Sequence, residues 1–237
     1  MTRETIFITG ASAGIGASMA TSFAAAGWNV AMAARRVHLL EEVKAQMETG
    51  AEHALCLETD ISDLASCQRA IRDAIERFGG LDVLVNNAGY LGPRTSLEAY
   101  DPEAFAQSLK VNILGTFQMI QTALPHVRRS SRGRIVSISS YLGRNGLPDC
   151  AGYVAGKFGV EGVTQALHHE EHENGVIAVT LAPGMVATEM LQNYLNEEDV
   201  SEYRSPHSVG AAAVRCIESL NDTHAGAQLD IDPWMEG

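Results

Sequence analysis

Two side chains that can exchange protons stand four positions apart in the stretch GYVAGK, at residues 152–157. They are Tyr153 and Lys157. On a helix, residues at this spacing share one face, with Cβ atoms roughly 5 to 6 Å apart. An ammonium beside a phenol favours the phenolate, so we expect Lys157 to lower the pKa of Tyr153 from its usual value of about 10. The pair predicts proton transfer near neutral pH, although an isolated pair of this kind is more often an ordinary surface pair.

A glycine-rich turn, TGASAGIG at residues 9–16, follows the first apolar run of the chain. Gly10, Gly14 and Gly16 would let the backbone turn sharply and approach a pyrophosphate, whose charge the amides at a helix N-terminus would meet. The spacing is G-x-x-x-G-x-G, which differs from the common G-x-G-x-x-G of dinucleotide sites. Tight packing alone could explain the glycines, but their place between an expected strand and an expected helix favours phosphate binding.

The elements that position these motifs alternate along the chain. Apolar runs without a polar alternation are typical of strands covered on both faces of a parallel sheet, and they occupy residues 5–9, 28–34, 53–58, 82–87, 134–140 and 176–183. Stretches with helical spacing lie between them, at 39–47, 64–78, 105–127 and 154–172. The pattern predicts an α/β fold: one domain over residues 1–237, with a doubly wound Rossmann-type parallel sheet, helices on both faces, and ligands beyond the carboxyl ends of the strands. The polar, acidic segment 189–206 could form a substrate lid.

The charge balance excludes several kinds of partner. The chain has 29 Asp and Glu against 17 Lys and Arg, a formal net charge of −12 at pH 7. Such a surface repels phosphate backbones and anionic lipid heads, so we expect no nucleic-acid partner and no membrane association. Neither a signal peptide nor an uninterrupted apolar run of about 18 residues is present in the sequence, which favours a cytoplasmic protein.

The cysteines and histidines give no metal-binding pattern. The cysteines are widely spaced, which predicts reduced thiols in the cytoplasm. They are Cys56, Cys67, Cys150 and Cys216. His168 and His172 stand at i and i+4 in LHHEEHE, but the stretch is not HExxH and is more typical of a solvated helix end. We therefore expect no metal.

Six motifs together resemble the short-chain dehydrogenase/reductase family. They are TGASAGIG, NNAG at 86–89, Asn112 in VNILGTF, Ser140 in SISS, YVAGK, and PGMVAT at 183–188. The motifs follow that family's order from about residue 5 to about residue 190. Ser140 lies 13 positions before Tyr153, as the family pattern asks, and Ser139 is the alternative for the same role.

The resemblance implies four catalytic residues. Tyr153 would donate the proton to a carbonyl oxygen, and Lys157 would lower its pKa and hold the nicotinamide ribose. Ser140 would offer its hydroxyl to the same substrate oxygen as charge develops there. Asn112 would support a water that relays protons to Lys157. The hydride would come from the cofactor, while the protein supplies position and electrostatics.

The resemblance also implies contacts with a dinucleotide. Val186 and Thr188 would hold the carboxamide, Asn86 to Gly89 would line the adenine and ribose side, and Asp60 with Ile61 would meet the adenine. The expected cofactor-binding residues are Gly10, Ser12, Gly14, Ile15, Gly16, Arg35, Arg36, Asp60, Ile61, Asn87, Ala88, Gly89, Tyr153, Lys157, Pro183, Gly184, Val186 and Thr188.

The second expected strand indicates which dinucleotide binds. Sites that prefer NAD usually carry an acidic residue at the end of this strand, about 20 positions after the glycines. Here the stretch is AMAARR, so Ala34 stands in that place and Arg35 and Arg36 follow. A guanidinium can bind the 2′-phosphate of NADP, which a carboxylate would repel. We expect NADP(H) to be preferred over NAD(H), through Arg35 first and Arg36 second; the alternative is that both arginines are simply solvated.

The substrate pocket is expected to be mainly apolar and aromatic, which favours a hydrophobic ketone, alcohol or acyl-type substrate. Its candidate residues are Ser140, Tyr153, Tyr90, Tyr141, Leu147, Met185 and Met190. The leading hypothesis is an NADP(H)-dependent oxidoreductase acting on a carbonyl or secondary alcohol. The alternatives are a cofactor-binding regulatory protein, or an epimerase or dehydratase using the same site. By resemblance we expect a homodimer or homotetramer, although LDIDPWMEG at residues 229–237 departs from the family's usual C-terminal stretch.

Overall fold

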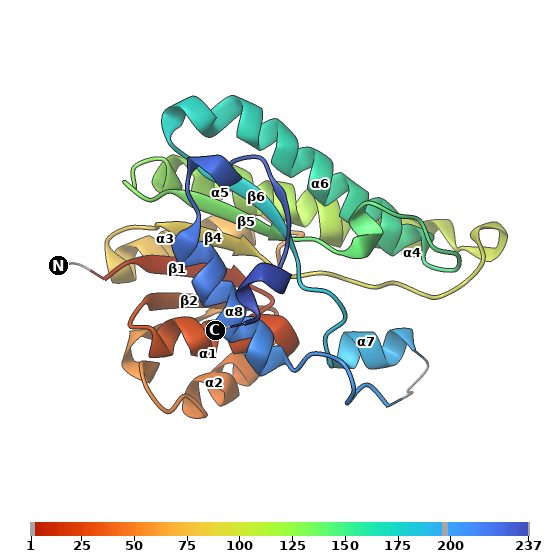
Figure 1. The fold of residues 1–237 in the computed structure, drawn as a ribbon, viewed down its shortest axis with the longest axis horizontal. Coiled ribbons are helices and arrows are strands. Elements are labelled where there is room, and N and C mark those ends of the chain that lie inside the picture. The colour runs from red at the N-terminus through yellow and green to blue at the C-terminus, as the bar shows by residue number, and fades with distance from the viewer. Residues whose placement is uncertain (1–2, 196–198, 237) are drawn as a thin grey trace.

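A seven-stranded parallel sheet forms the centre of the computed structural model, which describes residues 3–195 and 199–236. Its strand order is β3-β2-β1-β4-β5-β6-β7 (Figure 1). The strands are β1 (Thr5–Thr9), β2 (Asn29–Ala34), β3 (Ala54–Glu58), β4 (Val83–Asn86), β5 (Arg134–Ile138), β6 (Ile177–Ala182) and β7 (Gln228–Asp230). The chain order reverses between β1 and β4, and in open α/β sheets this switch point is where ligands bind, beyond the carboxyl ends of the strands.

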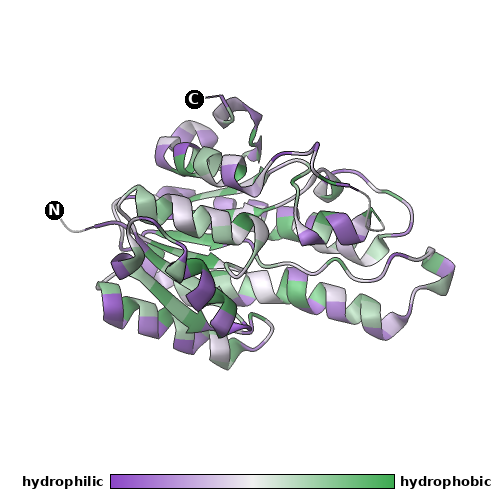
Figure 2. Ribbon diagram, turned by 90° about the horizontal axis from the view of Figure 1, so that it is seen from below, coloured by the Kyte–Doolittle hydropathy of each residue, from purple (hydrophilic) through white to green (hydrophobic). Residues whose placement is uncertain are grey.

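Each face of the sheet has its own hydrophobic core, as the unbroken apolar runs predict. Ile6 and Ile8 of β1 point into one core and Phe7 points into the other, and all three are fully buried. Side chains alternate between the faces of a strand, so an apolar run without alternation fills both cores. Figure 2 shows the apolar strands enclosed by helices whose outer sides are hydrophilic.

The helices form two layers. Those that pack into the core of Ile6 and Ile8 are α1 (Gly14–Ala25), α2 (Val37–Ala45) and α8 (Pro206–Ser219). Those that pack into the core of Phe7 are α3 (Leu64–Phe78), α5 (Thr116–Val127) and α6 (Ala151–Glu171) (Figure 1). The doubly wound parallel fold predicted from the sequence is confirmed.

Beyond shifts of a few residues at the ends of elements, the structure differs from the sequence prediction at one expected helix and at two elements that were not expected. The expected helix 105–127 is α4 (Pro102–Leu109), a π-helical segment (Lys110–Gly115) and α5. Helix α8 and strand β7 lie outside the expected elements. Strand β7 has the sequence QLD and is largely exposed, so no apolar run marks it. Within the described residues, none of the helices has the length and apolar character needed to cross a bilayer.

The expected lid segment 189–206 begins with the short helix α7 (Glu189–Tyr194). Residues 196–198 lie outside the described residues. The Arg94 guanidinium lies 4.8 Å from the ring centroid of Tyr194 and donates a hydrogen bond to the Tyr194 carbonyl oxygen (2.5 Å). Helix α7 is therefore fastened to the loop that follows β4.

Candidate active site

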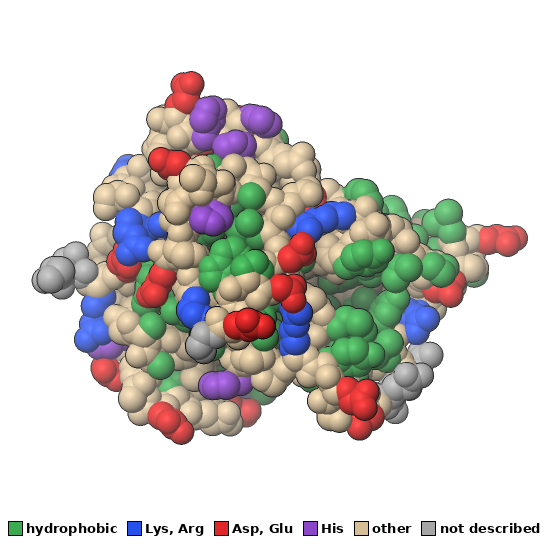
Figure 3. Space-filling model, viewed as in Figure 1, with side chains coloured by type: hydrophobic (Ala, Val, Ile, Leu, Met, Phe, Trp, Pro, Cys, Tyr) green, Lys and Arg blue, Asp and Glu red, His purple; other side chains and the backbone are tan. Residues whose placement is uncertain are grey.

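The motif residues converge at one edge of the sheet because the segments after parallel strands all leave at the strands' carboxyl ends. Hydrophobic side chains gather around a hollow on the face that carries α7 (Figure 3). Five apolar or aromatic residues expected at the substrate pocket are exposed on the segments that follow β4, β5 and β6. They are Tyr90, Tyr141, Leu147, Met185 and Met190.

The glycine-rich turn is locked against the end of β4. A Cβ at Gly16 would clash with the Gly10 carbonyl oxygen and with Asn87 Nδ2. The side-chain amide of Asn87 donates hydrogen bonds to the carbonyl oxygens of Thr9 (2.9 Å) and Gly10 (3.2 Å). The turn thus leaves bare backbone amides at the N-terminus of α1, as a phosphate site requires.

The same turn faces the loop after β6. A Cβ at Gly14, whose φ is +56°, would lie 3.1 Å from Thr188 Cγ2. Thr188 caps α7 by accepting a hydrogen bond from the Leu191 amide (3.2 Å), and Val186 is buried. The expected pyrophosphate and carboxamide contacts therefore lie across from one another. A side chain larger than glycine at position 14 would press against Thr188, so the turn and the loop after β6 are closely packed.

Helix α6 places Tyr153 and Lys157 on one face, with Lys157 Nζ 5.6 Å from the centroid of the Tyr153 ring. Lys157 is only 5% exposed, and its Nζ donates a hydrogen bond to the Ile138 carbonyl oxygen (2.7 Å). Burial lowers the pKa of Lys157 to about 8, against the opposing effect of the Glu161 charge. A lysine with this pKa changes charge within the range where an enzyme works.

The expectation that Lys157 lowers the pKa of Tyr153 is wrong for this structure. Burial raises the pKa of Tyr153 to about 12, and the hydrogen bond with Ser140 only partly opposes this effect. The Lys157 ammonium donates a hydrogen bond to the Ile138 carbonyl oxygen and lies 5.6 Å from the centroid of the Tyr153 ring, and its charge is not among the causes of the shift. The phenol is therefore in its acid form at neutral pH.

The two serines after β5 have different surroundings. Ser139 is 2% exposed, and its hydroxyl donates to Glu161 Oε1 (2.5 Å). Ser140 lies beside Tyr153, and its hydroxyl accepts a hydrogen bond from the Leu142 amide (3.1 Å). The geometry therefore favours Ser140 over Ser139 as the group that meets a substrate oxygen.

The buried side chain of Asn112 fixes the segment after β4. It accepts a hydrogen bond from the Tyr90 amide and donates one to the Tyr90 carbonyl oxygen, each at 2.8 Å. A Cβ at Gly89 would lie 3.3 Å from Asn112 Oδ1 and 3.9 Å from Lys157 Nζ. The π-helical segment and α6 thus bring Asn112 and Lys157 to the same point of the backbone.

Arg35 and Arg36 follow β2 and are both exposed, next to the methyl group of Ala34. Arg35 lies close enough to Asp60 to act on its pKa. Burial pushes the pKa of Asp60 up, yet hydrogen bonds from Ser62 and the charge of Arg35 leave it below its ordinary value. Ile61 is buried against Gly115 of the π-helical segment.

The sequence analysis missed a buried carboxylate, Glu161, which is 3% exposed. It also missed Arg144, whose Nε lies 3.6 Å from Glu161 Oε1. The available signal was the position of Glu161, one helical turn after Lys157 in a run of small and apolar residues. Charged residues are almost never fully buried unless they are paired, so a lone glutamate there marks a polar network.

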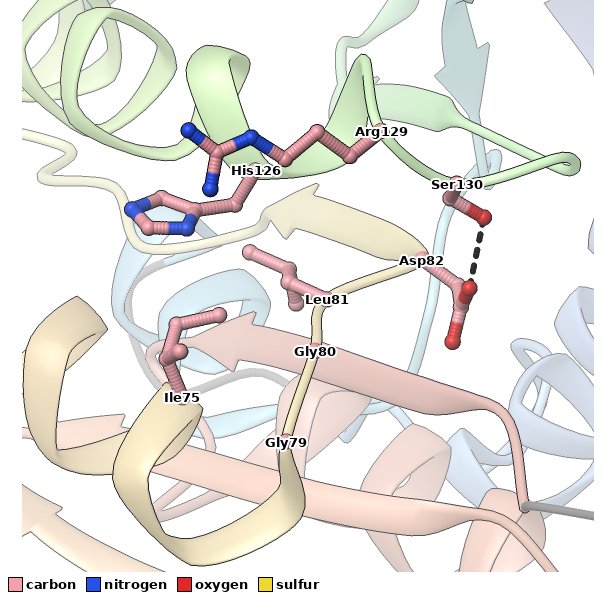
Figure 4. Close-up of a pocket in the computed structure, with 8 residues that line it drawn as sticks. All are labelled: Ile75, Gly79, Gly80, Leu81, Asp82, His126, Arg129 and Ser130. Atoms are coloured by element: carbon pink, nitrogen blue, oxygen red, sulfur yellow. Dashed lines mark hydrogen bonds between the residues drawn. The ribbon is translucent and has the colours of Figure 1, made fainter.

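Two other features lie away from this edge. A hollow of about 240 Å³ at the amino end of β4 is lined by Leu81, His126, Arg129 and neighbouring residues (Figure 4). It contains none of the predicted site residues. His168 and His172 have ring centroids 5.3 Å apart, and the parts of the chain that the structure describes contain no group of three or more side chains that could hold a metal ion.

Comparison with known proteins agrees with this geometry. The family model for short chain dehydrogenases matches residues 4–199. A 3-oxoacyl-(acyl-carrier-protein) reductase of Staphylococcus aureus is 32% identical over 210 residues, covering 85% of this chain and 83% of the relative. The human dehydrogenase/reductase SDR family member 7 is 32% identical over 203 residues, covering 84% of this chain and 60% of the relative. The chain therefore spans less than two thirds of some curated relatives.

Solved structures share the whole fold. Levodione reductase superposes with a TM-score of 0.89 and 25% identity, covering 98% of this chain and 96% of that one. ElxO with NADP bound gives 0.88 and 27%, covering 97% of each chain. A 3-ketoacyl-(acyl-carrier-protein) reductase from Brucella melitensis complexed with NADH gives 0.87 and 28%, covering 97% and 96%.

The fold thus defines a doubly wound α/β protein with a glycine-rich turn after β1. The chain belongs to the short-chain dehydrogenase family.

Proposed function

We propose that the protein is an NADP(H)-dependent oxidoreductase that interconverts a carbonyl group and a secondary alcohol. The observation that carries this proposal is the meeting of a phenol, a buried lysine and a serine hydroxyl at Tyr153, Lys157 and Ser140. A cofactor-binding regulatory protein needs the glycine-rich turn but not this proton-transfer group.

In the proposed mechanism, Tyr153 donates its proton to the carbonyl oxygen during reduction and takes it back during oxidation. The high pKa of Tyr153, raised by burial to about 12, keeps this proton in place until charge develops on the substrate oxygen. Ser140 donates a hydrogen bond to the same oxygen, and Lys157 places its buried amino group beside the Tyr153 ring. Asn112 holds the backbone at Gly89 and Tyr90 that borders the site and, as in the family, would support the proton-relaying water.

The cofactor would supply the hydride, and the chain's residues would hold it. Gly10, Ser12, Gly14, Ile15 and Gly16 would meet the pyrophosphate, while Lys157 would bind the nicotinamide ribose. Pro183, Gly184, Val186 and Thr188 would hold the carboxamide, and Asp60, Ile61, Asn87, Ala88 and Gly89 would line the adenosine half. The exposed guanidinium groups of Arg35 and Arg36 support NADP(H) over NAD(H).

The substrate is proposed to be a small carbonyl or alcohol compound with an apolar body. The exposed apolar rim of Tyr90, Tyr141, Leu147, Met185 and Met190 supports this class. The names of the bacterial relative and of levodione reductase both describe carbonyl reduction. We propose that segment 189–206 closes over this rim as a lid within a single domain of residues 1–237, since α7 is fastened to the loop after β4.

We also propose that the protein is a homodimer or homotetramer in the cytoplasm. Leu114 at the end of the π-helical segment, Phe117 of α5 and Phe158 of α6 are all exposed, at 42%, 44% and 47%. Contiguous exposed apolar groups on neighbouring helices support an interface between copies. The described cysteines are all free thiols, which supports the cytoplasm as the compartment.

A panel of ketones with NADPH and NADH, and of secondary alcohols with NADP and NAD, tests the function. We expect the absorbance of the reduced nicotinamide to change with at least one apolar carbonyl compound. Product formation without a net change in that absorbance would favour an epimerase or dehydratase. Tight cofactor binding without turnover across the panel would favour the regulatory protein.

A further inference from the structure

Glu161 of α6 is a buried carboxylate with hydroxyl partners on β6 and just after β5. Its Oε1 accepts a hydrogen bond from Ser139 Oγ (2.5 Å), and its Oε2 accepts one from Thr180 Oγ1 of β6 (2.7 Å). Burying a charge costs several kcal/mol unless it is paired and hydrogen-bonded. Two hydroxyl groups satisfy the oxygens, but a hydroxyl group carries no charge to compensate that of the carboxylate.

Two cations lie near this carboxylate. Arg144 has its Nε 3.6 Å from Glu161 Oε1, but its Nη1 lies 3.2 Å from Asp230 Oδ1, so its charge is shared between two carboxylates. Lys157 lies one turn before Glu161 on the same helix and is equally buried. Glu161 therefore has two cations nearby, Arg144 and Lys157, and its charge raises the pKa of Lys157 against the larger effect of burial.

Lys157 and Glu161 bond to two consecutive residues, the last residue of β5 and the one that follows it. Lys157 Nζ bonds to the Ile138 carbonyl oxygen, and Glu161 bonds to the next residue, Ser139. Ser140 follows directly. A Cβ at Gly143, in the turn after Ser140, would lie 2.5 Å from Ser139 Oγ and 3.2 Å from Glu161 Cγ, so the network is closely packed.

We infer that Glu161 is a positioning residue of the reaction: its carboxylate keeps Lys157 in the ammonium form and, through Ser139, fixes the strand end that presents Ser140. This inference rests on the proposed oxidoreductase function. Glu161 acts only through these neighbours.

The charges around Lys157 predict the direction in which its pKa moves when Glu161 is substituted. Burial lowers the pKa of Lys157 to about 8, and the charge of Glu161 acts in the opposite direction. The groups that face the pair are Tyr153 on the same helix, Arg144 from the loop after β5, and Asp230 behind Arg144. Removing the negative charge of Glu161 leaves burial less opposed, so the pKa of Lys157 falls further.

A titration of the protein without cofactor tests this effect independently of turnover. The chain has three lysines, Lys44, Lys110 and Lys157, so carbon-13 labelling gives a simple spectrum in which Lys157→Ala assigns the signal. We expect Glu161→Gln to lower the pKa of Lys157 by about one unit, roughly tenfold in the protonation equilibrium. Glu161→Asp keeps the charge and should leave this pKa near its wild-type value. An unchanged pKa in a folded Glu161→Gln protein overturns the inference.

The matched control is Glu171→Gln at the other end of α6. Glu171 is also buried, and it is paired with Arg128 (2.5 Å and 2.8 Å) far from Lys157. Its substitution should lower stability without moving the Lys157 titration. A shift of equal size in Glu171→Gln would show a general loosening of the helix and would contradict the role of Glu161.

Kinetics complete the test. In Glu161→Gln the alkaline limb of kcat/KM for carbonyl reduction should move to lower pH, by about the shift seen for Lys157. In Glu161→Asp the limb should stay, while kcat falls because the shorter side chain no longer reaches Ser139. Wild-type activity and an unmoved limb in Glu161→Gln, or an Asp variant with normal kcat, would overturn the positioning role. A wild type that turns over no carbonyl compound contradicts the proposed function instead, and leaves the titration result standing.

Discussion

The two ends of the candidate site are built in opposite ways. At the α6 end, Lys157 and Glu161 are almost fully buried, with hydrogen-bond partners at Ile138, Ser139 and Thr180. At the β2 end, Arg35 and Arg36 are exposed to solvent. The buried end is rigid and sensitive to any loss of a partner, because an unpaired buried charge is costly. The exposed end is available to a ligand, and its substitution should affect recognition rather than folding.

The largest effect should come from the buried end. Tyr153→Phe keeps the ring but deletes the hydroxyl that donates the proton, so kcat should fall by roughly 10² to 10⁴ while the affinity for the cofactor persists. Steady-state kinetics with a carbonyl substrate and fluorescence titration of NADPH measure the two quantities.

Ser139→Ala and Ser140→Ala provide a matched comparison at the same end. Ser140→Ala should follow Tyr153→Phe in losing kcat, since its hydroxyl faces the same substrate oxygen. Ser139→Ala should lower stability and reduce kcat less than Ser140→Ala does, because its hydroxyl bonds to the buried Glu161 and acts on the substrate only through the position of Ser140. A Tyr153→Phe enzyme with near-normal kcat would remove Tyr153 from the proposed mechanism.

The exposed end should show a smaller and more selective effect. If each charged hydrogen bond to a 2′-phosphate contributes about 1.5 to 3 kcal/mol, the wild type should prefer NADPH over NADH by about 10- to 100-fold in kcat/KM. Arg35→Ala should abolish most of this preference and leave kcat with NADH and the free energy of unfolding nearly unchanged. Kinetics with both cofactors at two salt concentrations provide the measurement.

Arg36→Ala is the matched control for this prediction. A preference that survives Arg35→Ala but is lost in Arg36→Ala would transfer the role to Arg36. Equal use of NADH and NADPH by the wild type would contradict the interpretation of AMAARR as an NADP signal.

The comparison of the two ends also explains what the sequence could predict. The strands follow from apolar runs that must fill two cores, and the shared face of Tyr153 and Lys157 follows from helical spacing. The family spacing favoured Ser140 over Ser139, but only the fold shows which hydroxyl meets Glu161 and which lies beside Tyr153. It also gave the wrong direction for the pKa of Tyr153, since burial and the orientation of Lys157 depend on tertiary packing.

The C-terminal segment lies between these two extremes. Strand β7 carries no apolar run, yet Asp230 pairs with Arg144 and Asp232 pairs with Arg204. Arg204 in turn donates a hydrogen bond to the Pro183 carbonyl oxygen (3.2 Å) in the loop expected to hold the carboxamide. The unusual LDIDPWMEG stretch is thus connected to both sides of the site through arginines that the sequence did not single out.

The smallest effect should come from Asp232→Asn. The Asp232 side chain is 64% exposed, and exposed ion pairs contribute about 0 to 1 kcal/mol because solvent and salt screen them. The loop keeps a second support, since the Ala187 amide donates to the Arg204 carbonyl oxygen (2.8 Å) whatever residue stands at 232. The free energy of unfolding should therefore fall by less than about 1 kcal/mol, and KM for NADPH should change by no more than a few-fold. Both changes should shrink further at high salt. Urea unfolding and kinetics at low and high salt measure them, with Asp222→Asn on a distant turn as the control. A fall in the free energy of unfolding of more than about 2 kcal/mol that does not depend on salt would contradict this prediction. It would show that the ion pair behaves like the buried Glu161 network, where water does not replace a lost partner.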